Sequence, residues 1–326
     1  MTATTARRDF YQRISGLNAA PLWEVLSEIV GAAPNPKAIA ALWRYEELRP
    51  FLMESGELIT AKEAERRVLM LENPGYAGSS RITQSVYAGL QLVRPGELTD
   101  SHRHVASALR FVIEGGGEGD GAYTAVNGER VVMRPGDLIL TPSWTFHDHG
   151  NLGTSPVIWL DGLDIPIVNF FDASFAEHSS ADAVPPPLPH ASLFSFPYAP
   201  AREALATLPL DPSHGAKREY TQPDGSSVSR TLGAWLQRLP AGFHTAPYRS
   251  TESVVFCAVE GRGVSRIGDQ EFEWLPRDIF VAPSWHPVSH HAAVESVLFS
   301  FSDRPAQKAL GVWREDSKQP TAHGLG

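Results

Sequence analysis

The chain has 326 residues, of which 42% are hydrophobic and 20% charged, and its formal net charge is −9 at pH 7. The length suits two domains of ordinary size, the composition is that of a globular protein, and the acidic balance argues against nucleic acid as a partner. No apolar run is long enough for a signal peptide or a membrane span, so we expect a cytoplasmic protein without membrane contact.

Residues 1–75 are expected to form an N-terminal helical segment. Apolar residues recur there at helical spacing in two runs. The first run comprises Leu22, Val25, Leu26 and Ile29, and the second comprises Ile39, Leu42 and Trp43. Pro50 is expected to end the second helix, because proline lacks the backbone donor that a continuing helix needs. We expect these helices to pack on a barrel or on a neighbouring subunit.

The remainder of the chain is predicted to be mainly β. Short apolar runs separated by Pro-Gly, Gly-Gly and Asn-Gly turns indicate one β domain at residues 76–180 and another at 221–312. Residues 181–220 between them are expected to be a proline-rich linker, since Pro185–Pro187 cannot donate hydrogen bonds to a sheet. Residues 313–326 are expected to form a tail.

The two β domains are internal copies of one another. Both contain, in the same order, a turn with proline and glycine, a Glu-Gly pair that ends an apolar run, and a Pro-Ser-Trp sequence. These are Pro95-Gly96, Glu114-Gly115 and Pro142-Ser143-Trp144 in the first copy, and Pro240-Ala-Gly242, Glu260-Gly261 and Pro283-Ser284-Trp285 in the second. A repeat of this length predicts two related domains.

Three histidines of the first copy are replaced together in the second. His102, His104 and His147 align with Tyr248, Ser250 and Val288. His102 and His104 are two apart on a strand and point to one face, so that His147 on a later strand can complete a metal site. A lone His-x-His is more often a surface pair. The joint loss of all three histidines favours metal binding, because packing alone would not separate the copies at three ligand positions.

The spacing of these histidines matches the two motifs of the cupin barrel. The motifs are Gly96, five residues, His102-Arg-His104, and Gly136, five residues, Pro142, four residues, His147, three residues, Asn151. The predicted fold is therefore mainly β, a bicupin of two double-stranded β-helix barrels, of which only the first binds a metal. Ala108 stands where many cupins have a glutamate ligand. Three neutral imidazoles leave the charge of the ion available to an anionic chelating ligand.

Six short stretches carry a closer resemblance. They are Tyr87-Ala-Gly-Leu-Gln91, His102-Arg-His104, Ser107-Ala-Leu-Arg-Phe111, Thr141-Pro-Ser-Trp144, His147-Asp-His-Gly-Asn151 and Asp161-Gly-Leu-Asp164. In these stretches the chain resembles the gentisate 1,2-dioxygenase family, which includes salicylate, substituted-salicylate and 1-hydroxy-2-naphthoate dioxygenases. The resemblance extends from about Trp23 to Phe301.

This resemblance implies an Fe(II) enzyme, with one iron per chain, that is usually a homotetramer. A small aromatic hydroxy acid chelates the metal through its carboxylate and ortho hydroxyl, and O2 binds beside it. The ring opens between the two carbons that bear these groups, and both oxygen atoms enter the product. The protein supplies binding and orientation for this chemistry.

Arg110 is expected to bind the substrate carboxylate. It shares the strand parity of His102 and His104, so an undisturbed strand directs its guanidinium into the same cavity. Burial of an unpaired guanidinium is costly and requires an anion. A structural salt bridge is the alternative role of Arg110.

The resemblance implies roles for four more residues. Arg66 corresponds to a second arginine near the substrate, although the adjacent Arg67 leaves the register open. Gln91 and Asp161 correspond to pocket residues that hydrogen-bond the substrate or orient its surroundings, and Asp161 is counted with the catalytic group. His149 is close enough to the third ligand to act as a base for the substrate hydroxyl. Its alternative role is as that ligand.

Tyr87 and Gly89 share the parity of Gln91 and are expected to line the substrate pocket, where the small Gly89 favours tolerance of other ring substituents. The substrate stays open among gentisate, salicylate, nitro- or halosalicylate and hydroxynaphthoate. Two other functional classes also stay open. One is a bicupin that binds a small acid without turnover, and the other is a zinc-dependent isomerase or hydrolase.

Overall fold

The computed structural model describes most of the chain. The described ranges are residues 3–116, 121–179 and 193–316. The chain divides into two compact units, residues 1–35 and 36–326. The first unit contains helices α1 (Ala3–Ser15) and α2 (Leu22–Ile29), so the first apolar run is helical as predicted. Within the described ranges, no helix is both long and apolar enough to cross a membrane.

The second apolar run forms a strand instead of a helix. Strand β1 (Ala41–Trp43) pairs antiparallel with β19 (Ile279–Ala282) of the second barrel. Helix α3 (Tyr45–Leu58) starts after β1 and contains Pro50, and the short α4 (Ala61–Ala64) follows. Both expectations for this run are therefore wrong. Pairing with a distant strand overrides the local periodicity, and a proline in the second helical turn removes only one backbone hydrogen bond.

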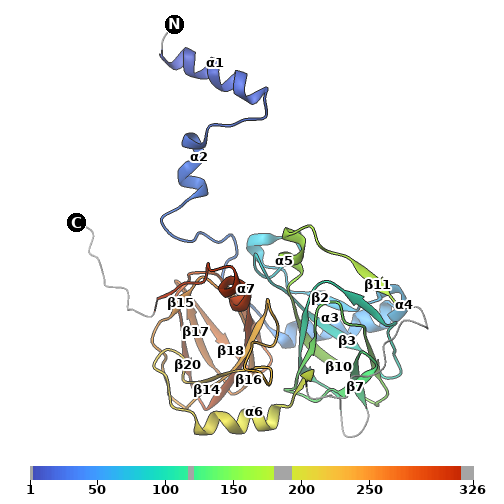
Figure 1. Cartoon of the computed structure of the whole chain (residues 1–326). Coiled ribbons are helices and arrows are strands. Elements are labelled where there is room, and N and C mark those ends of the chain that lie inside the picture. The colour runs from blue at the N-terminus through green and yellow to red at the C-terminus, as the bar shows by residue number, and fades with distance from the viewer. Residues whose placement is uncertain (1–2, 117–120, 180–192, 317–326) are drawn as a thin grey trace. The chain divides into compact units, whose positions relative to one another are not determined.

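The first barrel is built from two sheets (Figure 1). Their strand orders are β12-β8-β5-β10-β3-β2 and β11-β4-β9-β6-β7. The elements are β2 (Val68–Met70), the 3-10 turn η1 (Pro74–Tyr76), β3 (Tyr87–Val93), β4 (His102–His104), β5 (Ala108–Glu114), β6 (Ala122–Val126), β7 (Glu129–Val132), β8 (Leu138–Thr141), β9 (His147–Asn151), β10 (Val157–Leu163), helix α5 (Ile165–Phe170) and β11 (Ala176–His178).

The second barrel repeats this arrangement. Its sheets have the orders β1-β19-β16-β21-β14-β13 and β18-β17-β20, with a short pair β15-β22. The elements are β13 (Ala216–Glu219), β14 (Gly233–Leu239), β15 (Arg249–Ser250), β16 (Val254–Glu260), β17 (Gly263–Ile267), β18 (Gln270–Trp274), β20 (Val288–Ala292), β21 (Ser296–Ser302), helix α7 (Arg304–Ala309) and β22 (Glu315–Asp316).

Each barrel receives an edge strand from the other repeat. Strand β1 precedes the first barrel in sequence but extends the sheet of the second, and β12 (Ser195–Phe196) precedes the second barrel but extends the sheet of the first. Helix α6 (Tyr198–Ala204) and the turn η3 (Leu205–Thr207) follow β12. The described part of the expected linker, from residue 193, is thus folded into the two sheets. Its remainder and most of the expected tail lie outside the described residues.

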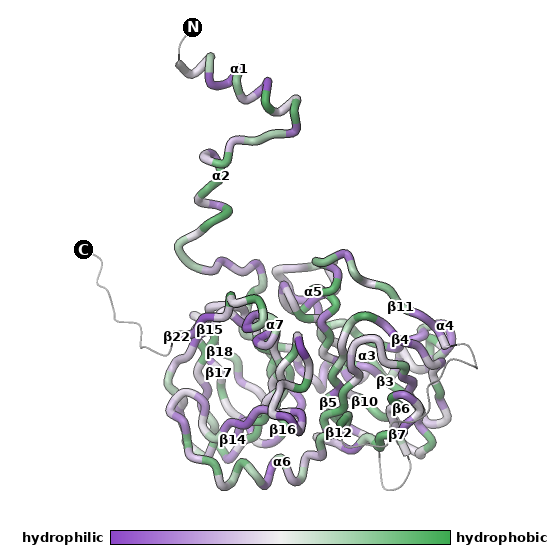
Figure 2. Tube along the Cα trace, viewed as in Figure 1, coloured by the Kyte–Doolittle hydropathy of each residue, from purple (hydrophilic) through white to green (hydrophobic). Residues whose placement is uncertain are grey.

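The two barrels meet across a hydrophobic core with matched polar contacts. The rings of Phe111 and Phe299 stack with centroids 4.0 Å apart, and hydrophobic residues continue along β5 and β10 (Figure 2). Asp164 accepts a hydrogen bond from Thr231 of the second barrel. In the corresponding place Asp303 accepts one from Ser85 of the first, at 2.7 Å. This reciprocity shows that the repeat extends to the interface.

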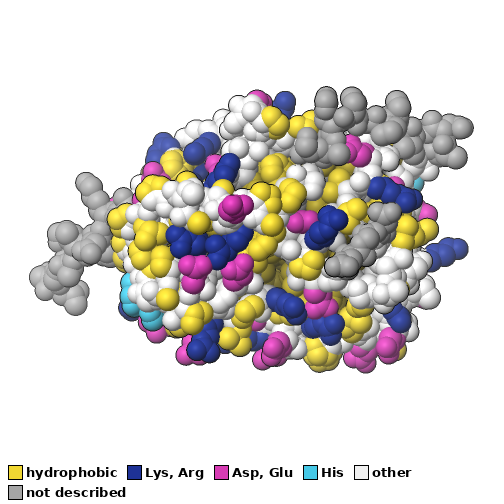
Figure 3. Space-filling view, turned by 90° about the horizontal axis from the view of Figure 1, so that it is seen from below, with side chains coloured by type: hydrophobic (Ala, Val, Ile, Leu, Met, Phe, Trp, Pro, Cys, Tyr) yellow, Lys and Arg dark blue, Asp and Glu magenta, His cyan; other side chains and the backbone are white. Residues whose placement is uncertain are grey.

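Acidic and basic side chains alternate on the surface of this unit. On the face drawn in Figure 3, they lie next to one another and not in separate patches. The second barrel provides examples, because Glu295 pairs with Arg202 at 2.6 Å and with Arg238 at 3.1 Å. Exposed pairs of this kind contribute little stability, so the barrels depend on their apolar cores.

Gly115→Ala is expected to destabilise the fold by about 3 kcal/mol or more, since it combines strain with a clash. Gly115 has a φ of +87°, and a Cβ on it would lie 2.0 Å from the main-chain oxygen of Pro156. Gly96→Ala is the matched control, because Gly96 has a φ of +80° with no atom near that position. It should cost only about 1–2 kcal/mol. Equal losses in denaturant unfolding would contradict the close approach at Gly115.

Candidate metal centre

Two strands bring the three predicted ligands together. Strand β4 carries His102 and His104, and His102 lies directly opposite His147 of β9 in the antiparallel register. The ligand nitrogens of the three imidazoles all lie within 4.8 Å of one another. Arg103, between the two histidines of β4, lies with its guanidinium 4.4 Å from the centre of the Trp144 ring. The alternation of side chains along β4 therefore places both histidines on one face.

Main-chain carbonyls hold two of the imidazoles in a metal-binding tautomer. Nδ1 of His104 lies 2.7 Å from the carbonyl oxygen of Ala106, and Nδ1 of His147 lies 2.9 Å from that of Thr145. Since a carbonyl only accepts, each Nδ1 carries the proton, and Nε2 keeps a free lone pair. Nε2 of His147 is buried and has no hydrogen-bond partner in the described part of the chain. These nitrogens fit a transition-metal ion such as iron or zinc.

Burial keeps the imidazoles in the neutral form that binds metals. It lowers the pKa of His102 to about 3, with the nearby Arg66 guanidinium as the next cause. It also lowers the pKa of His104 and holds the pKa of His147 well below its ordinary value. Because metal binding requires unprotonated imidazole, no proton has to leave these rings near neutral pH.

Arg66, and not Arg67, faces the three histidines. Nη2 of Arg66 lies 2.8 Å from Nε2 of His102. Arg67 is turned toward Glu97 and forms a bidentate pair with it at 2.8 and 2.9 Å. The two adjacent arginine side chains therefore have different partners. The sequence left open which of the two arginines faces the site. The contact of Arg67 with Glu97 leaves Arg66 as the one that does.

Arg110 lies inside the same barrel, and its ion partner is Asp161. Both side chains are buried, with Nε of Arg110 3.4 Å from Oδ1 of Asp161, and Arg110 also donates to the hydroxyl of Thr141. Asp161 accepts a further hydrogen bond from Trp159 at 2.9 Å. Burial raises the pKa of Asp161 to about 6, against the lowering effect of Arg110. The buried guanidinium is therefore not unpaired, as the sequence argument assumed, because β10 places Asp161 opposite Arg110.

The side chains around the histidines carry excess positive charge. Burial, followed by repulsion from Arg110, lowers the pKa of Arg66 to about 10, which leaves the Arg66 guanidinium charged at neutral pH. Asp161 is one buried carboxylate facing two arginines. A divalent cation bound by the histidines would add to this charge. Such surroundings favour an anionic ligand.

His149 lies close to the ligands but outside their cluster. It is 1% exposed, its Nδ1 lies 3.0 Å from the hydroxyl of Thr124, and its Nε2 has no hydrogen-bond partner among the described residues. His290 takes the corresponding place in the second barrel, with Nδ1 2.7 Å from the hydroxyl of Ser265. Since the copy without the three ligands keeps this histidine, its presence alone does not indicate metal chemistry.

Strand β3 contributes the three other predicted pocket residues. Gln91 is 3% exposed, and Gly89 lies opposite Asp161 in the register of β3 and β10. A Cβ on Gly89 would lie 3.1 Å from the hydroxyl of Tyr87 and 2.5 Å from a methyl group of Val68. Gly89 therefore lies next to the Arg110–Asp161 pair, and because it has no side chain, Tyr87 and Val68 can approach its backbone closely.

Two residues near the site were missed by the sequence argument. Thr141, at the end of β8, accepts the hydrogen bond from Arg110. His178 of β11 pairs opposite His102, with ring centroids 6.4 Å apart, and both line an open groove of about 1070 Å³. Local spacing carries no signal for His178, because its partner strand β4 is distant in the chain.

The chain is similar to known proteins in both sequence and fold. Residues 89–163 match the family model described as Cupin domain. The chain is 47% identical to gentisate 1,2 dioxygenase 1 of Aquipseudomonas alcaligenes, over 96% of each chain. The chain belongs to the gentisate 1,2-dioxygenase family. It is also 32% identical to the 5-aminosalicylate 1,2-dioxygenase of a Comamonas species, over 97% of this chain and 91% of that protein.

A solved structure is similar in fold to almost the whole length of this gentisate 1,2-dioxygenase family member. The salicylate 1,2-dioxygenase from Pseudoaminobacter salicylatoxidans, determined as an adduct with gentisate, has a TM-score of 0.88 and 33% identity, over 97% of this chain and 95% of that one. The predicted bicupin fold and the predicted family are both confirmed.

Proposed function

We propose that this protein is an Fe(II)-dependent ring-cleaving dioxygenase that acts on a small aromatic acid of the gentisate or salicylate type. The ring opens between the carbons that bear the carboxyl and hydroxyl groups, and both atoms of O2 enter the product. The observation that carries the proposal is the cluster of three neutral imidazoles, within 4.8 Å of one another, beside the guanidinium groups of Arg66 and Arg110.

His102, His104 and His147 are assigned as the iron ligands. Three protein ligands leave coordination positions for other groups, as a catalytic metal site requires. Bound there, Fe(II) supplies the electron-transfer chemistry that allows O2 to react with an aromatic ring. The nitrogen of His147 that is buried without a hydrogen bond supports this assignment.

The two arginines are assigned to the substrate carboxylate. A guanidinium offers a planar pair of donors that matches a carboxylate, and burial strengthens these hydrogen bonds. Asp161 holds Arg110 in place through its contact at 3.4 Å and leaves Arg66 without a buried carboxylate of its own. The substrate carboxylate supplies the second negative charge, so that charge and hydrogen bonding both select an aromatic acid.

His149 is assigned as the base for the substrate hydroxyl. Nδ1 of His149 lies 3.0 Å from the hydroxyl oxygen of Thr124, which can accept the Nδ1 proton while the hydroxyl donates to the sulfur of Met133. Nε2 of His149 is then an unprotonated nitrogen without a protein donor, and it can accept a proton from a bound ligand. Deprotonation of the hydroxyl gives the phenolate that chelates a metal most strongly.

Gln91, Tyr87 and Gly89 are assigned to the part of the pocket that contacts the substrate ring. The relatives named for gentisate and for 5-aminosalicylate differ in ring substituent but share the acid with an ortho hydroxyl. The relative with 47% identity favours gentisate as the first substrate to test. The residues of β3 then decide how far other substituents are tolerated.

Oxygen uptake by the iron-loaded protein tests this proposal. We expect saturable uptake of one O2 per molecule of gentisate or of a related salicylate, and none with benzoate, which lacks the ortho hydroxyl. Zinc-loaded protein is the control and should take up no O2. Binding of the acids by iron-loaded protein without any O2 uptake would support a binding protein, and turnover by the zinc form would support an isomerase or hydrolase.

We expect one iron per chain after reconstitution. The second barrel has Tyr248, Ser250 and Val288 at the positions that correspond to the ligands, and these side chains offer no imidazole nitrogen. Metal analysis against protein concentration measures the ratio. A firmly bound second ion per chain would contradict the assignment of the site to the first barrel alone.

We also propose a homotetramer located in the cytoplasm. The assembly rests on the family resemblance, and the location rests on the expectation drawn from the sequence. Light scattering during size-exclusion chromatography tests the assembly, with a mass of four chains as the expected result and a stable monomer as the contradictory one.

A further inference from the structure

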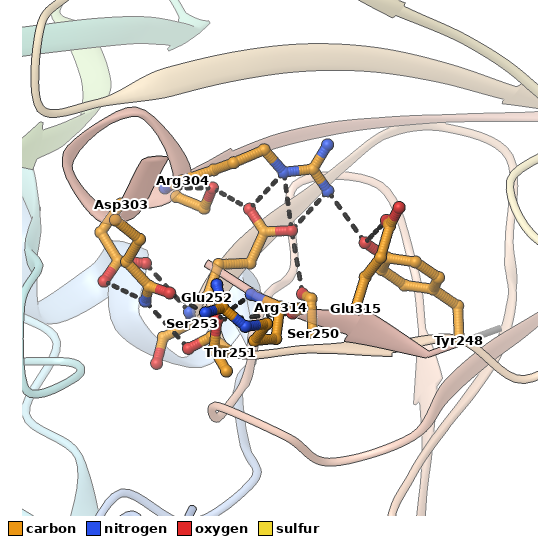
Figure 4. A network of polar contacts seen from close by, with 11 residues as sticks. Tyr248, Ser250, Thr251, Glu252, Ser253, Asp303, Arg304, Arg314 and Glu315 are labelled. Carbon is orange, nitrogen blue, oxygen red and sulfur yellow. Dashed lines mark hydrogen bonds and ion pairs between the residues drawn. The ribbon is translucent and has the colours of Figure 1, made fainter. Parts of the chain in front are cut away.

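In the second barrel, two positions that correspond to metal ligands belong to a polar network (Figure 4). Ser250, which aligns with His104, donates to Glu252 at 3.0 Å, and Tyr248, which aligns with His102, accepts from Arg304 at 3.3 Å. Nε of Arg304 lies 2.9 Å from both carboxylate oxygens of Glu252. The Arg304–Glu252 pair therefore balances its own charge.

A small cavity lies beside this network. Its volume is about 30 Å³, and Lys217, Gln237 and His290 are among its lining residues. It is the counterpart of the site in the first barrel, because Lys217 pairs with Gln237 in the same register in which Val68 pairs with Gln91. In the second barrel, Lys217 thus occupies the position of Val68 in the first. Gln237 and His290 correspond to Gln91 and His149, so both barrels have the glutamine and the histidine.

Two of these residues present hydrogen-bond donors without a protein acceptor. Gln237 is 1% exposed, and its Nε2 has no hydrogen-bond partner within the described residues. Trp274 donates to the hydroxyl of Ser265 at 2.9 Å, and this hydroxyl lies 2.7 Å from Nδ1 of His290, to which it can donate its proton. The proton of His290 is then on Nε2. The tautomer is the reverse of the one assigned to His149 in the first barrel.

Lys217 adds a positive charge at the edge of this cavity. Across the ranges that the structure describes, its ammonium group makes no hydrogen bond, and it lies 5.4 Å from the centre of the Trp235 ring. Burial, followed by repulsion from Arg304, lowers the pKa of Lys217 to about 8, so the group is charged at neutral pH. The carboxylates of Glu252, Glu219 and Asp211 attract this ammonium group, and Glu252 is also paired with Arg304. Burial lowers the pKa of His214 to about 2, which makes that ring neutral.

We propose that this cavity binds a small carboxylate of the size of formate or acetate. Its oxygens accept hydrogen bonds from Lys217, Gln237 and His290, and its charge pairs with the ammonium group. A carboxylate accepts from all three donors at once and forms a charge-assisted hydrogen bond with the ammonium group, which is stronger than a hydrogen bond to water. The volume accommodates roughly three or four non-hydrogen atoms, which excludes an aromatic acid. The protein therefore has a second ligand site, distinct in size and chemistry from the metal centre.

Acetate binding to the iron-loaded protein tests the proposal, with chloride replacing acetate at constant ionic strength. The melting temperature of the native protein is expected to rise with the logarithm of the acetate concentration once that concentration exceeds the dissociation constant. Lys217→Gln should weaken acetate binding in calorimetry by about tenfold to a hundredfold, the loss expected for a hydrogen bond to a charged group. Lys308→Gln removes one exposed positive charge from α7 and is the matched control, which should bind acetate as the native protein does.

Three results would overturn the proposal. Acetate could bind to Lys217→Gln as tightly as to the native protein, which would place it elsewhere, including at the iron. Chloride could raise the melting temperature as much as acetate does. A crystal structure of the native protein grown in acetate could contain only water between Lys217 and His290, and this measurement decides the question even if the variant fails to fold. None of these results depends on dioxygenase activity.

Discussion

Replacement of any one of His102, His104 or His147 by alanine is expected to remove the iron and to abolish ring cleavage. Two remaining imidazoles make a poor site, because each ligand contributes to an affinity that must exceed the cost of taking the ion from water. The ligand nitrogens lie within 4.8 Å of one another, so no histidine is distant enough to be dispensable. Metal analysis and O2 uptake with gentisate measure the two effects on the same samples.

The second barrel provides the matched control for these variants. Tyr248 aligns with His102, and Tyr248→Phe removes only a hydroxyl that contacts Arg304 and Glu315. This variant should keep both iron and turnover. Retention of iron and activity by any of the three histidine variants would put the ligand assignment in doubt, and loss of iron in Tyr248→Phe would show that the second barrel also contributes to metal binding.

Arg110→Ala is expected to lower kcat/KM by about tenfold to a hundredfold or more, while the iron is retained. A hydrogen bond to a charged group contributes about 1.5–3 kcal/mol, and poor orientation of the substrate adds to the loss. The iron should stay because the guanidinium contacts Asp161 and Thr141, and neither is an assigned ligand. Arg110→Lys should restore little, since an ammonium group lacks the planar fork of donors.

The buried partner of Arg110 makes a second variant necessary. Loss of the guanidinium leaves Asp161 buried without its cation, which costs about 3–5 kcal/mol in comparable pairs. The double variant Arg110→Ala with Asp161→Asn removes both charges, so its melting temperature should recover toward that of the native protein. If turnover stays low although the melting temperature recovers, instability is not the cause, and the Arg110–Asp161 pair acts on the substrate. If turnover returns with stability, the role of Arg110 is structural.

Strand alternation made part of the site predictable from the sequence. Residues two apart on a strand share a face, so His102 and His104 converge, and Arg110 points into the same barrel once the strand is recognised. The repeat added the decisive contrast, because the second copy lacks all three histidines at the aligned positions. Both signals are local or come from direct comparison of two segments, and neither requires knowledge of which strands pair.

The sequence by itself therefore determined the barrel type, the repeat and the three candidate metal ligands. The tertiary structure alone decided which residues meet from distant segments: β1 with β19, Arg67 with Glu97, and Asp161 with Arg110. It also placed Lys217 at an interior cavity of the second barrel. Side-chain direction alternates along a strand and depends only on the local sequence. The choice of partner strand, in contrast, depends on the packing of the whole barrel.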